Sequence, residues 1–277
     1  MSRLRNVNQE RVPAVLSIAG SDSGGGAGIQ ADLKAFARCG VHGMTAITAI
    51  TAQNTVGVEA VEAISPQTIV AQVGTVAEDI GVDAVKIGML GTAETVDAVV
   101  EALGLLGEVP VVVDPVMVAE SGAILLDDDA RAALIERLLP LATVATPNIP
   151  EARALTGGAE GESQEDLARE VLALGPRAVV VTGGHSERLV DLFFDGRESA
   201  EIGGERHPDG AAHGSGCTHS SALAAYLALG GSPLDAARKA REVASAAVAH
   251  GLHEIGDGPG PVDVFHLASG PLSRFRP

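Results

Sequence analysis

The chain has 277 residues with a formal net charge of −17, and this excess of acid excludes the basic surface that nucleic-acid and anionic-membrane binding need. Hydrophobic residues make up 46% of it and aromatic residues only 2%, which predicts a core of Val, Ile, Leu and Ala rather than disorder. With Cys39 and Cys217 as its two cysteines and neither a secretion signal nor a membrane span, the sequence predicts one cytoplasmic domain, residues 1–277, without disulfides.

The basic residues are unevenly divided, because only Lys34, Lys86 and Lys239 are lysines among the 19 Lys and Arg. An acidic surface poor in lysine is what a salt-rich cytoplasm favours, since salt screens the self-repulsion of the chain. Ordinary acidic drift gives the same composition, so both interpretations stay open. Loss of structure in low salt would favour the first.

Strand and helix patterns alternate along the chain. The apolar run 13–20 predicts a first strand, residues 27–39 carry apolar groups at helical spacing, and the β-branched run 45–51 predicts the next strand. Residues 56–64 alternate apolar and polar groups, which predicts an exposed strand or small flap. The remaining predictions are helices at 66–80, 93–106, 127–139, 163–174, 217–229 and 233–250, strands at 84–88, 109–113, 143–145 and 178–181, and a hairpin over 189–202.

This alternation predicts an α/β fold with a mainly parallel central sheet and helices on both faces. In such sheets ligands bind beyond the carboxyl ends of the strands. Polar and glycine-rich segments gather at those ends, which favours an enzyme over a structural protein. They are residues 20–22, 53–54, 88–89, 114, 148 and 182–184.

The sharpest motif is His213-Gly-Ser-Gly-Cys-Thr, directly before an Ala-rich helix. Its glycines allow a tight turn that leaves the N–H groups of Gly214, Gly216 and Cys217 free at a helix N-terminus. Such a turn is an anion site suited to a transferring phosphoryl group. A cysteine in the first turn also feels the positive helix end, which favours its thiolate. The alternative is a glycine-rich helix start with a buried cysteine.

Two further groups of residues could take part in chemistry. The loop 21–28 (SDSGGGAG) matches neither the P-loop nor the dinucleotide-binding spacing, and so is better suited to a flat ligand. Asp32 follows on an apolar helix face, where it either needs a partner or is a solvated acid. Asp114 and Glu151 could hold Mg²⁺ through water, with Asn148 beside them. Asn148 fits helix capping equally well.

At this point the chain resembles the hydroxymethylpyrimidine/phosphomethylpyrimidine kinases of the ribokinase-like superfamily. The segments that carry the resemblance occur in order over nearly the whole chain: AGSDSGGGAGIQADLKAF, ITAQNT, KIGML, DPVM, TPNIPEA, GGH and HGSGCT. The resemblance implies a ribokinase-like fold and a homodimer. It also implies two ATP-dependent reactions of thiamine biosynthesis: phosphorylation of 4-amino-5-hydroxymethyl-2-methylpyrimidine, then of its monophosphate to the diphosphate.

The resemblance also assigns roles to individual residues. It makes Gln53 the residue that binds the pyrimidine and Cys217 the catalytic base. The other implied positions are Ala27, Asp32 and Met89 in the pyrimidine pocket, Gly214 and Gly216 in the catalytic turn, Ser215, Asn148 and Thr182 on the ATP side, and Asp114 and Glu151 near Mg²⁺. Thr182 is a departure, because many members have a lysine there to contact phosphate. Weaker ATP binding and a K⁺ ion in place of that charge are both open.

Three other functions compete with this interpretation. A pyridoxal or pyridoxine kinase shares the fold, ATP and a hydroxymethyl group on a flat ring, although Gln53 and Met89 favour the pyrimidine. A non-catalytic pyrimidine-binding regulator gains slight support from Thr182, while Cys217 and the anion turn count against it. A dinucleotide oxidoreductase is disfavoured, since its glycine spacing is missing.

Overall fold

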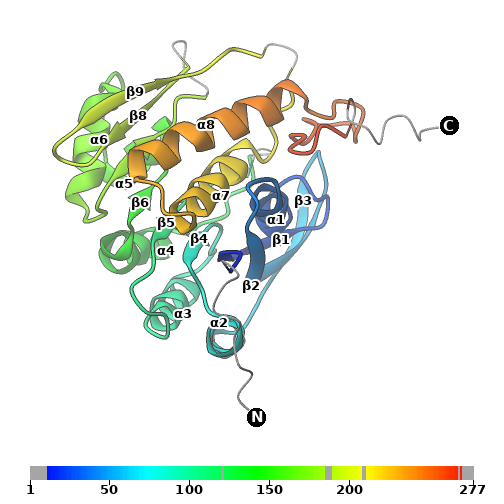
Figure 1. Cartoon of the computed structure of the whole chain (residues 1–277), viewed down its shortest axis with the longest axis vertical. Helices are drawn as coiled ribbons and strands as arrows, with labels where there is room; N and C mark the ends of the chain where they lie inside the picture. The colour runs from blue at the N-terminus through cyan, green and yellow to red at the C-terminus, as the bar shows by residue number, and fades with distance from the viewer. Residues whose placement is uncertain (1–10, 120–121, 185–188, 208–209, 268, 270–277) are drawn as a thin grey trace.

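The strands form one nine-stranded sheet in the order β3-β2-β1-β4-β5-β6-β7-β8-β9 (Figure 1). The computed structural model describes residues 11–119, 122–184, 189–207, 210–267 and 269. Six strands pair in parallel, and β3, β8 and β9 extend the two edges antiparallel. Strand bounds are β1 (Ala14–Asp22), β2 (His42–Gln53), β3 (Val58–Ala63), β4 (Ala84–Ile87), β5 (Val111–Val113), β6 (Val144–Ala145), β7 (Val179–Val181), β8 (Val190–Phe194) and β9 (Ser199–Gly203).

Helices cover both faces of the sheet. The α1, α7 and α8 helices lie on one face and α2 to α6 on the other, as the two separate core clusters show (Figure 1). Helix bounds are α1 (Gly28–Arg38), α2 (Pro66–Asp79), α3 (Ala93–Leu103), α4 (Asp128–Ala133), α5 (Ile149–Thr156), α6 (Gln164–Ala173), α7 (Ser215–Ala228) and α8 (Pro233–Ala249). The predicted mainly parallel sheet with helices on both faces and a small flap, here β3, is therefore confirmed.

Side chains of the central strands alternate between the two cores, as a pleated strand requires. Val15 packs with α1 and α7, whereas its neighbour Leu16 faces α2 and α3. Both are fully buried, so these strands are apolar on both faces. The α7 helix is buried almost all round because α8 covers it from outside, which explains its run of alanines.

The structure differs from the predicted elements in two places. The helix expected over 127–139 is α4 followed by a π-helical turn (Leu134–Leu138) and a 3₁₀ turn (Leu139–Leu141) that contains Pro140. The short α5 helix was not predicted as an element of its own. Within the described residues, no helix combines the length and apolar character needed to cross a bilayer.

Candidate active site

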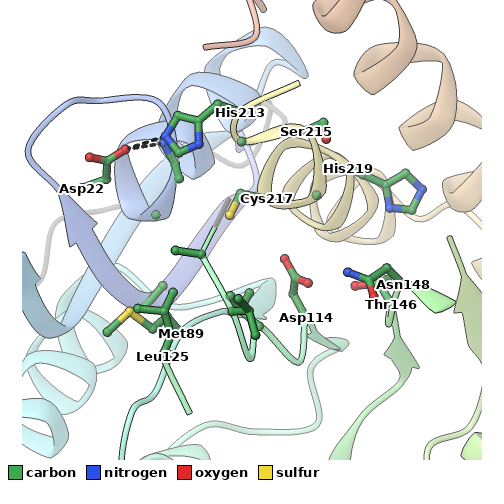
Figure 2. A pocket seen from close by; sticks show the side chains of 18 of the residues that line it. Asp22, Met89, Asp114, Leu125, Thr146, Asn148, His213, Ser215, Cys217 and His219 are labelled. Atoms are coloured by element: carbon green, nitrogen blue, oxygen red, sulfur yellow. Dashed lines mark hydrogen bonds and ion pairs between the residues drawn. The ribbon is translucent and has the colours of Figure 1, made fainter. Parts of the chain in front are cut away.

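A cavity of about 210 Å³ lies beyond the carboxyl ends of the parallel strands, at the N-terminus of α7. Eleven of the twelve predicted site residues line it: Ala27, Gln53, Met89, Asp114, Asn148, Glu151, Thr182, Gly214, Ser215, Gly216 and Cys217. Figure 2 shows Cys217 beside the cavity, with Met89 and Leu125 toward one end and Asn148 and His219 toward the other. The structure thus gathers these residues in one place, and their individual roles stay predictions. His185 of the GGH segment lies outside the described residues.

The turn before α7 has the geometry of an anion site. Gly214 is the N-cap with φ +84°, a left-handed conformation, and a Cβ there would lie 1.8 Å from the carbonyl oxygen of Gly26. No side chain caps the helix. The amide of Ser215 donates to the carbonyl of Ala212 at 2.9 Å, while the amides of Gly214, Gly216 and Cys217 have no partner among the described residues. These free N–H groups and the positive helix end suit a phosphoryl group.

The predicted lowering of the Cys217 pKa is wrong. Burial raises the pKa of this thiol to about 12, and the ammonium of Lys86 opposes that rise while Asp32 and Asp114 add to it. The helix N-terminus acts within one turn, but withdrawal from water penalises a thiolate more strongly. The thiol of the resting protein is therefore protonated at neutral pH.

Asp32 is the one predicted pocket residue that the structure does not bring to the cavity lining, because it lies buried beneath the cavity. Its side chain is 0% exposed, and Lys86 Nζ lies 2.9 Å from its Oδ1. Ser17 and Ser221 donate hydrogen bonds to its two oxygens at 2.6 and 2.7 Å. The alternative that Asp32 needs a partner is confirmed: it neutralises a buried lysine, and that lysine lines the cavity.

Asp114 faces the cavity from the end of β5, and Glu151 faces it from the first turn of α5, the helix that follows β6. Ser220 Oγ donates to Asp114 at 2.8 Å, and Lys86 Nζ lies 3.9 Å from the same oxygen. Burial raises the pKa of Asp114, although Lys86 and Ser220 oppose this. Burial and the neighbouring Asp114 raise the pKa of Glu151 to about 8. A cation here would favour the charged forms of both side chains and so oppose the two pKa rises, and the oxygen donors therefore fit Mg²⁺.

The capping role of Asn148 is confirmed. Its side chain accepts from the amide of Glu151 at 2.8 Å, and the Glu151 carboxylate accepts from the amide of Asn148 at 2.9 Å, which closes a capping box on α5. Among the described residues no three His, Cys, Asp or Glu side chains are grouped to hold a metal ion. A bound Mg²⁺ would therefore take most of its oxygen ligands from water and phosphate.

Sequence reasoning missed the pair of Asp22 and His213. His213 Nε2 lies 3.2 Å from Asp22 Oδ2, which also accepts from the amides of Gly26 and Ala27 at 3.0 and 2.8 Å. Burial opposes the charge on Asp22, but His213 and the amides of Ala27 and Gly24 outweigh it and lower its pKa. The pair fastens the glycine loop after β1 to the turn before α7. An Asp followed by glycines at a strand end is the signal that could have indicated it.

A second missed group lies at the other end of the cavity. Asp191 on β8, His219 on α7 and Arg241 on α8 all line it, and Asp191 and His219 are only 0% and 4% exposed. Arg241 Nη1 lies 3.2 Å from Asp191 Oδ1. No signal beyond the residue types indicates this pair, because 50 residues separate Asp191 from Arg241.

The comparisons with known proteins agree with this geometry. The pattern of the family described as "Phosphomethylpyrimidine kinase" matches residues 22–263. The chain is 51% identical to the hydroxymethylpyrimidine/phosphomethylpyrimidine kinase of Rhizobium meliloti (strain 1021), over 91% of this chain and 96% of that protein.

Solved structures give the same result. A phosphomethylpyrimidine kinase from Clostridium difficile 630 superposes with a TM-score of 0.74 at 43% identity, covering 83% of this chain and 96% of that one. An ADP complex of Bacillus subtilis pyridoxal kinase superposes with a TM-score of 0.84 at 38% identity, covering 94% and 100%. The fold is that of these ribokinase-like kinases, and the chain belongs to the phosphomethylpyrimidine kinase family.

Proposed function

We propose that this protein is an ATP-dependent kinase that phosphorylates 4-amino-5-hydroxymethyl-2-methylpyrimidine and then its monophosphate, in thiamine biosynthesis. One observation carries the proposal: the uncapped anion turn at Gly214 and the predicted pyrimidine residues Gln53 and Met89 line the same cavity. A phosphoryl group held at the turn and a flat ring held at the other residues would meet in one enclosed space. Membership of the family supports the same activity.

The acceptor would lie between β1, β2 and the end of β4. The side-chain amide of Gln53 can pair with a ring nitrogen and the exocyclic amino group of an aminopyrimidine, since it offers both a donor and an acceptor. Met89 supplies an adaptable apolar wall. The sulfur of Met89 would lie 3.1 Å from a Cβ placed on Gly20, so glycine there leaves room for that wall. Ala27 adds a small side chain on the loop side.

In the transfer step the hydroxymethyl oxygen of the acceptor attacks the γ-phosphorus, and the bond from that phosphorus to the leaving ADP oxygen breaks. The amides of Gly214, Gly216 and Cys217 stabilise the charge on the transferring group. The proton of the hydroxyl passes to Cys217 once the thiol has lost its own proton to solvent, and the raised pKa keeps this ionised fraction small at neutral pH. Mg²⁺, which Asp114 and Glu151 would hold through water, supplies neutralising charge when bound.

A pyridoxal kinase activity is the second candidate. The observation that favours it is the similarity to pyridoxal kinase of Bacillus subtilis, whose superposition has a TM-score of 0.84. Pyridoxal also carries a hydroxymethyl group on a flat ring, so the same cavity would accept it. The homodimer and a K⁺ ion beside Thr182 remain proposals that rest on the resemblance, and the cytoplasmic location remains a proposal that rests on the cysteine content of the sequence.

The test is to incubate the purified protein with ATP, Mg²⁺ and the hydroxymethylpyrimidine, with pyridoxal in parallel and high KCl included, and to follow products by mass. We expect mono- and diphosphate of the pyrimidine, both lost in Cys217→Ala and retained in Cys39→Ala, the matched cysteine control. Pyridoxal phosphate alone would assign the second activity. Tight pyrimidine binding without any product would leave a regulator and refute the enzyme.

A further inference from the structure

A cluster of buried polar groups lies at the end of the cavity away from Met89, and no step of the proposed reaction uses it. We call it the 191–219–241 cluster, after Asp191, His219 and Arg241. The three residues come from β8, α7 and α8, and all of them line the cavity (Figure 2 labels His219). Two of them are more than nine-tenths buried.

Part of each charged group is already satisfied. Asp191 Oδ1 accepts from the amide of Gly183 at 2.9 Å and from Arg241 Nη1 at 3.2 Å. Arg241 Nη2 donates to the carbonyl of Leu189 at 2.9 Å. These bonds hold the carboxylate and the guanidinium in place and leave one edge of each turned away from them.

The other atoms of the cluster have no hydrogen-bond partner among the described residues. They are Asp191 Oδ2, both ring nitrogens of His219 and Arg241 Nε, four of the seven buried side-chain atoms in this condition. His219 Nε2 lies 3.7 Å from Asp191 Oδ2, too far for a hydrogen bond. Buried polar groups are nearly always paired, so such a concentration indicates a surface built for a ligand or for ordered water.

The unpaired atoms define the chemistry of that ligand. Asp191 Oδ2 accepts and Arg241 Nε donates. Burial lowers the pKa of His219, so its neutral ring offers one donor and one acceptor. Two adjacent hydroxyl groups match this set, because each hydroxyl both donates and accepts. A carboxylate that receives sugar hydroxyls is a common way to bind a nucleotide ribose.

The position of the cluster in the cavity fits the sugar of a bound nucleotide. His219 follows Gly214 by five residues on α7, about 7.5 Å along the helix axis at 1.5 Å per residue. The anion turn and the cluster line the same cavity, so a triphosphate whose end lies at the turn can reach the cluster with its sugar. We propose that the 191–219–241 cluster binds the ribose hydroxyls of the phosphoryl donor. This inference rests on the proposed function only in taking that donor to be a nucleoside triphosphate.

The experiment measures each of several nucleotides against each of several protein variants. Binding of ATP, 2′-deoxyATP, 3′-deoxyATP and GTP is measured by calorimetry without acceptor, and KM is measured with the hydroxymethylpyrimidine. We expect wild type to bind ATP roughly tenfold more tightly than at least one deoxy analogue. In His219→Leu and Asp191→Asn this ratio should fall to about two or less, while the ATP/GTP ratio stays constant. His250→Leu, which removes an exposed imidazole, should keep both ratios.

Several outcomes would overturn the proposal. Equal binding of ATP and both deoxy analogues by wild type would exclude a ribose contact, and a variant that changes only the ATP/GTP ratio would place the base at the cluster. A uniform loss of affinity with unchanged ratios would make the cluster structural. If Asp191→Asn does not fold, His219→Leu decides, because the His219 ring makes no hydrogen bond with any described residue. If the wild type binds ATP more tightly than a deoxy analogue but phosphorylates no acceptor, the kinase activity is refuted and the ribose site stands. If the protein binds no nucleotide at all, both proposals are refuted.

Discussion

Replacing Lys86 by methionine tests the buried charges beneath the cavity. The ammonium is 0% exposed and lies 2.9 Å from Asp32 and 3.9 Å from Asp114. Burial disfavours the charged form, but the carboxylates of Asp32 and Asp114 help to outweigh it and the pKa of Lys86 is raised, so the lysine is charged at neutral pH. Methionine keeps most of the volume and removes the charge, which leaves Asp32 buried without a counter-ion.

The expected cost follows from that geometry. Removing one partner of a buried ion pair costs about 3–5 kcal/mol, since the other charge stays uncompensated. The hydrogen bonds from Ser17 and Ser221 to Asp32 remain and favour the lower end, about 3 kcal/mol. At about 2–4 °C per kcal/mol for a chain of this size, the melting temperature should fall by about 6–12 °C in a calorimetric scan. Lys239→Met is the matched control, because Lys239 is exposed and its Nζ lies 5.1 Å from the centroid of the Tyr226 ring, and it should lose about 1 kcal/mol or less.

The double variant Lys86→Met/Asp32→Asn separates charge from packing. If the uncompensated carboxylate causes the loss, neutralising it should recover about half of the lost stability. Should Lys86→Met melt within about 2 °C of Lys239→Met, the ion pair would be energetically unimportant. A double variant no more stable than the single one would show that the loss comes from packing.

Three further predictions concern the cavity. Because the Cys217 pKa is raised to about 12, the rate of a transfer that needs the thiolate should rise with pH through about pH 9 without a plateau. Cys217→Asp should remove this rise in rate. A plateau of the wild-type rate near neutral pH would contradict the prediction. With Glu151 near 8 instead of its ordinary 4.5, the folded protein holds a proton that the unfolded chain has released, so stability falls as pH rises between these values. Glu151→Gln should flatten that fall in urea titrations, and an unchanged slope would refute the shift. Gln53→Leu should raise KM for the pyrimidine roughly tenfold and leave KM for ATP unchanged; equal effects on both would exclude a pyrimidine contact.

The architecture could be predicted because its determinants are local. The apolar run of β1 and the β-branched run of β2 each identify a buried strand, and alternation with helices then allows only a mainly parallel sheet. That sheet places strand ends such as Gln53 and Asp114 at one edge, so most of the site could be located too. The strand β6 is at the limit of this reasoning, because its two residues are too few to show a hydrophobic pattern.

What could not be predicted depends on partners far apart in the sequence. Asp32 and Lys86 are separated by 54 residues and Asp22 and His213 by 191, so residue type gives the need for a partner but not its identity. The prediction of a lowered Cys217 pKa was wrong for a related reason. Its position at a helix start is local and visible, whereas the burial that raises its pKa comes from the way α7 packs on the sheet.

The raised pKa also bears on how one cysteine can serve a phosphoryl transfer. A protonated thiol is a poor nucleophile and is slow to oxidise, so the resting cavity keeps Cys217 unreactive. The ammonium of Lys86 favours the thiolate of Cys217, whereas the carboxylates of Asp32 and Asp114 attract this ammonium and disfavour the thiolate. Any change that weakens their hold on Lys86 makes the thiolate easier to form. The buried charges that stabilise the sheet beneath the cavity are thus the same charges that set the readiness of Cys217 to accept a proton.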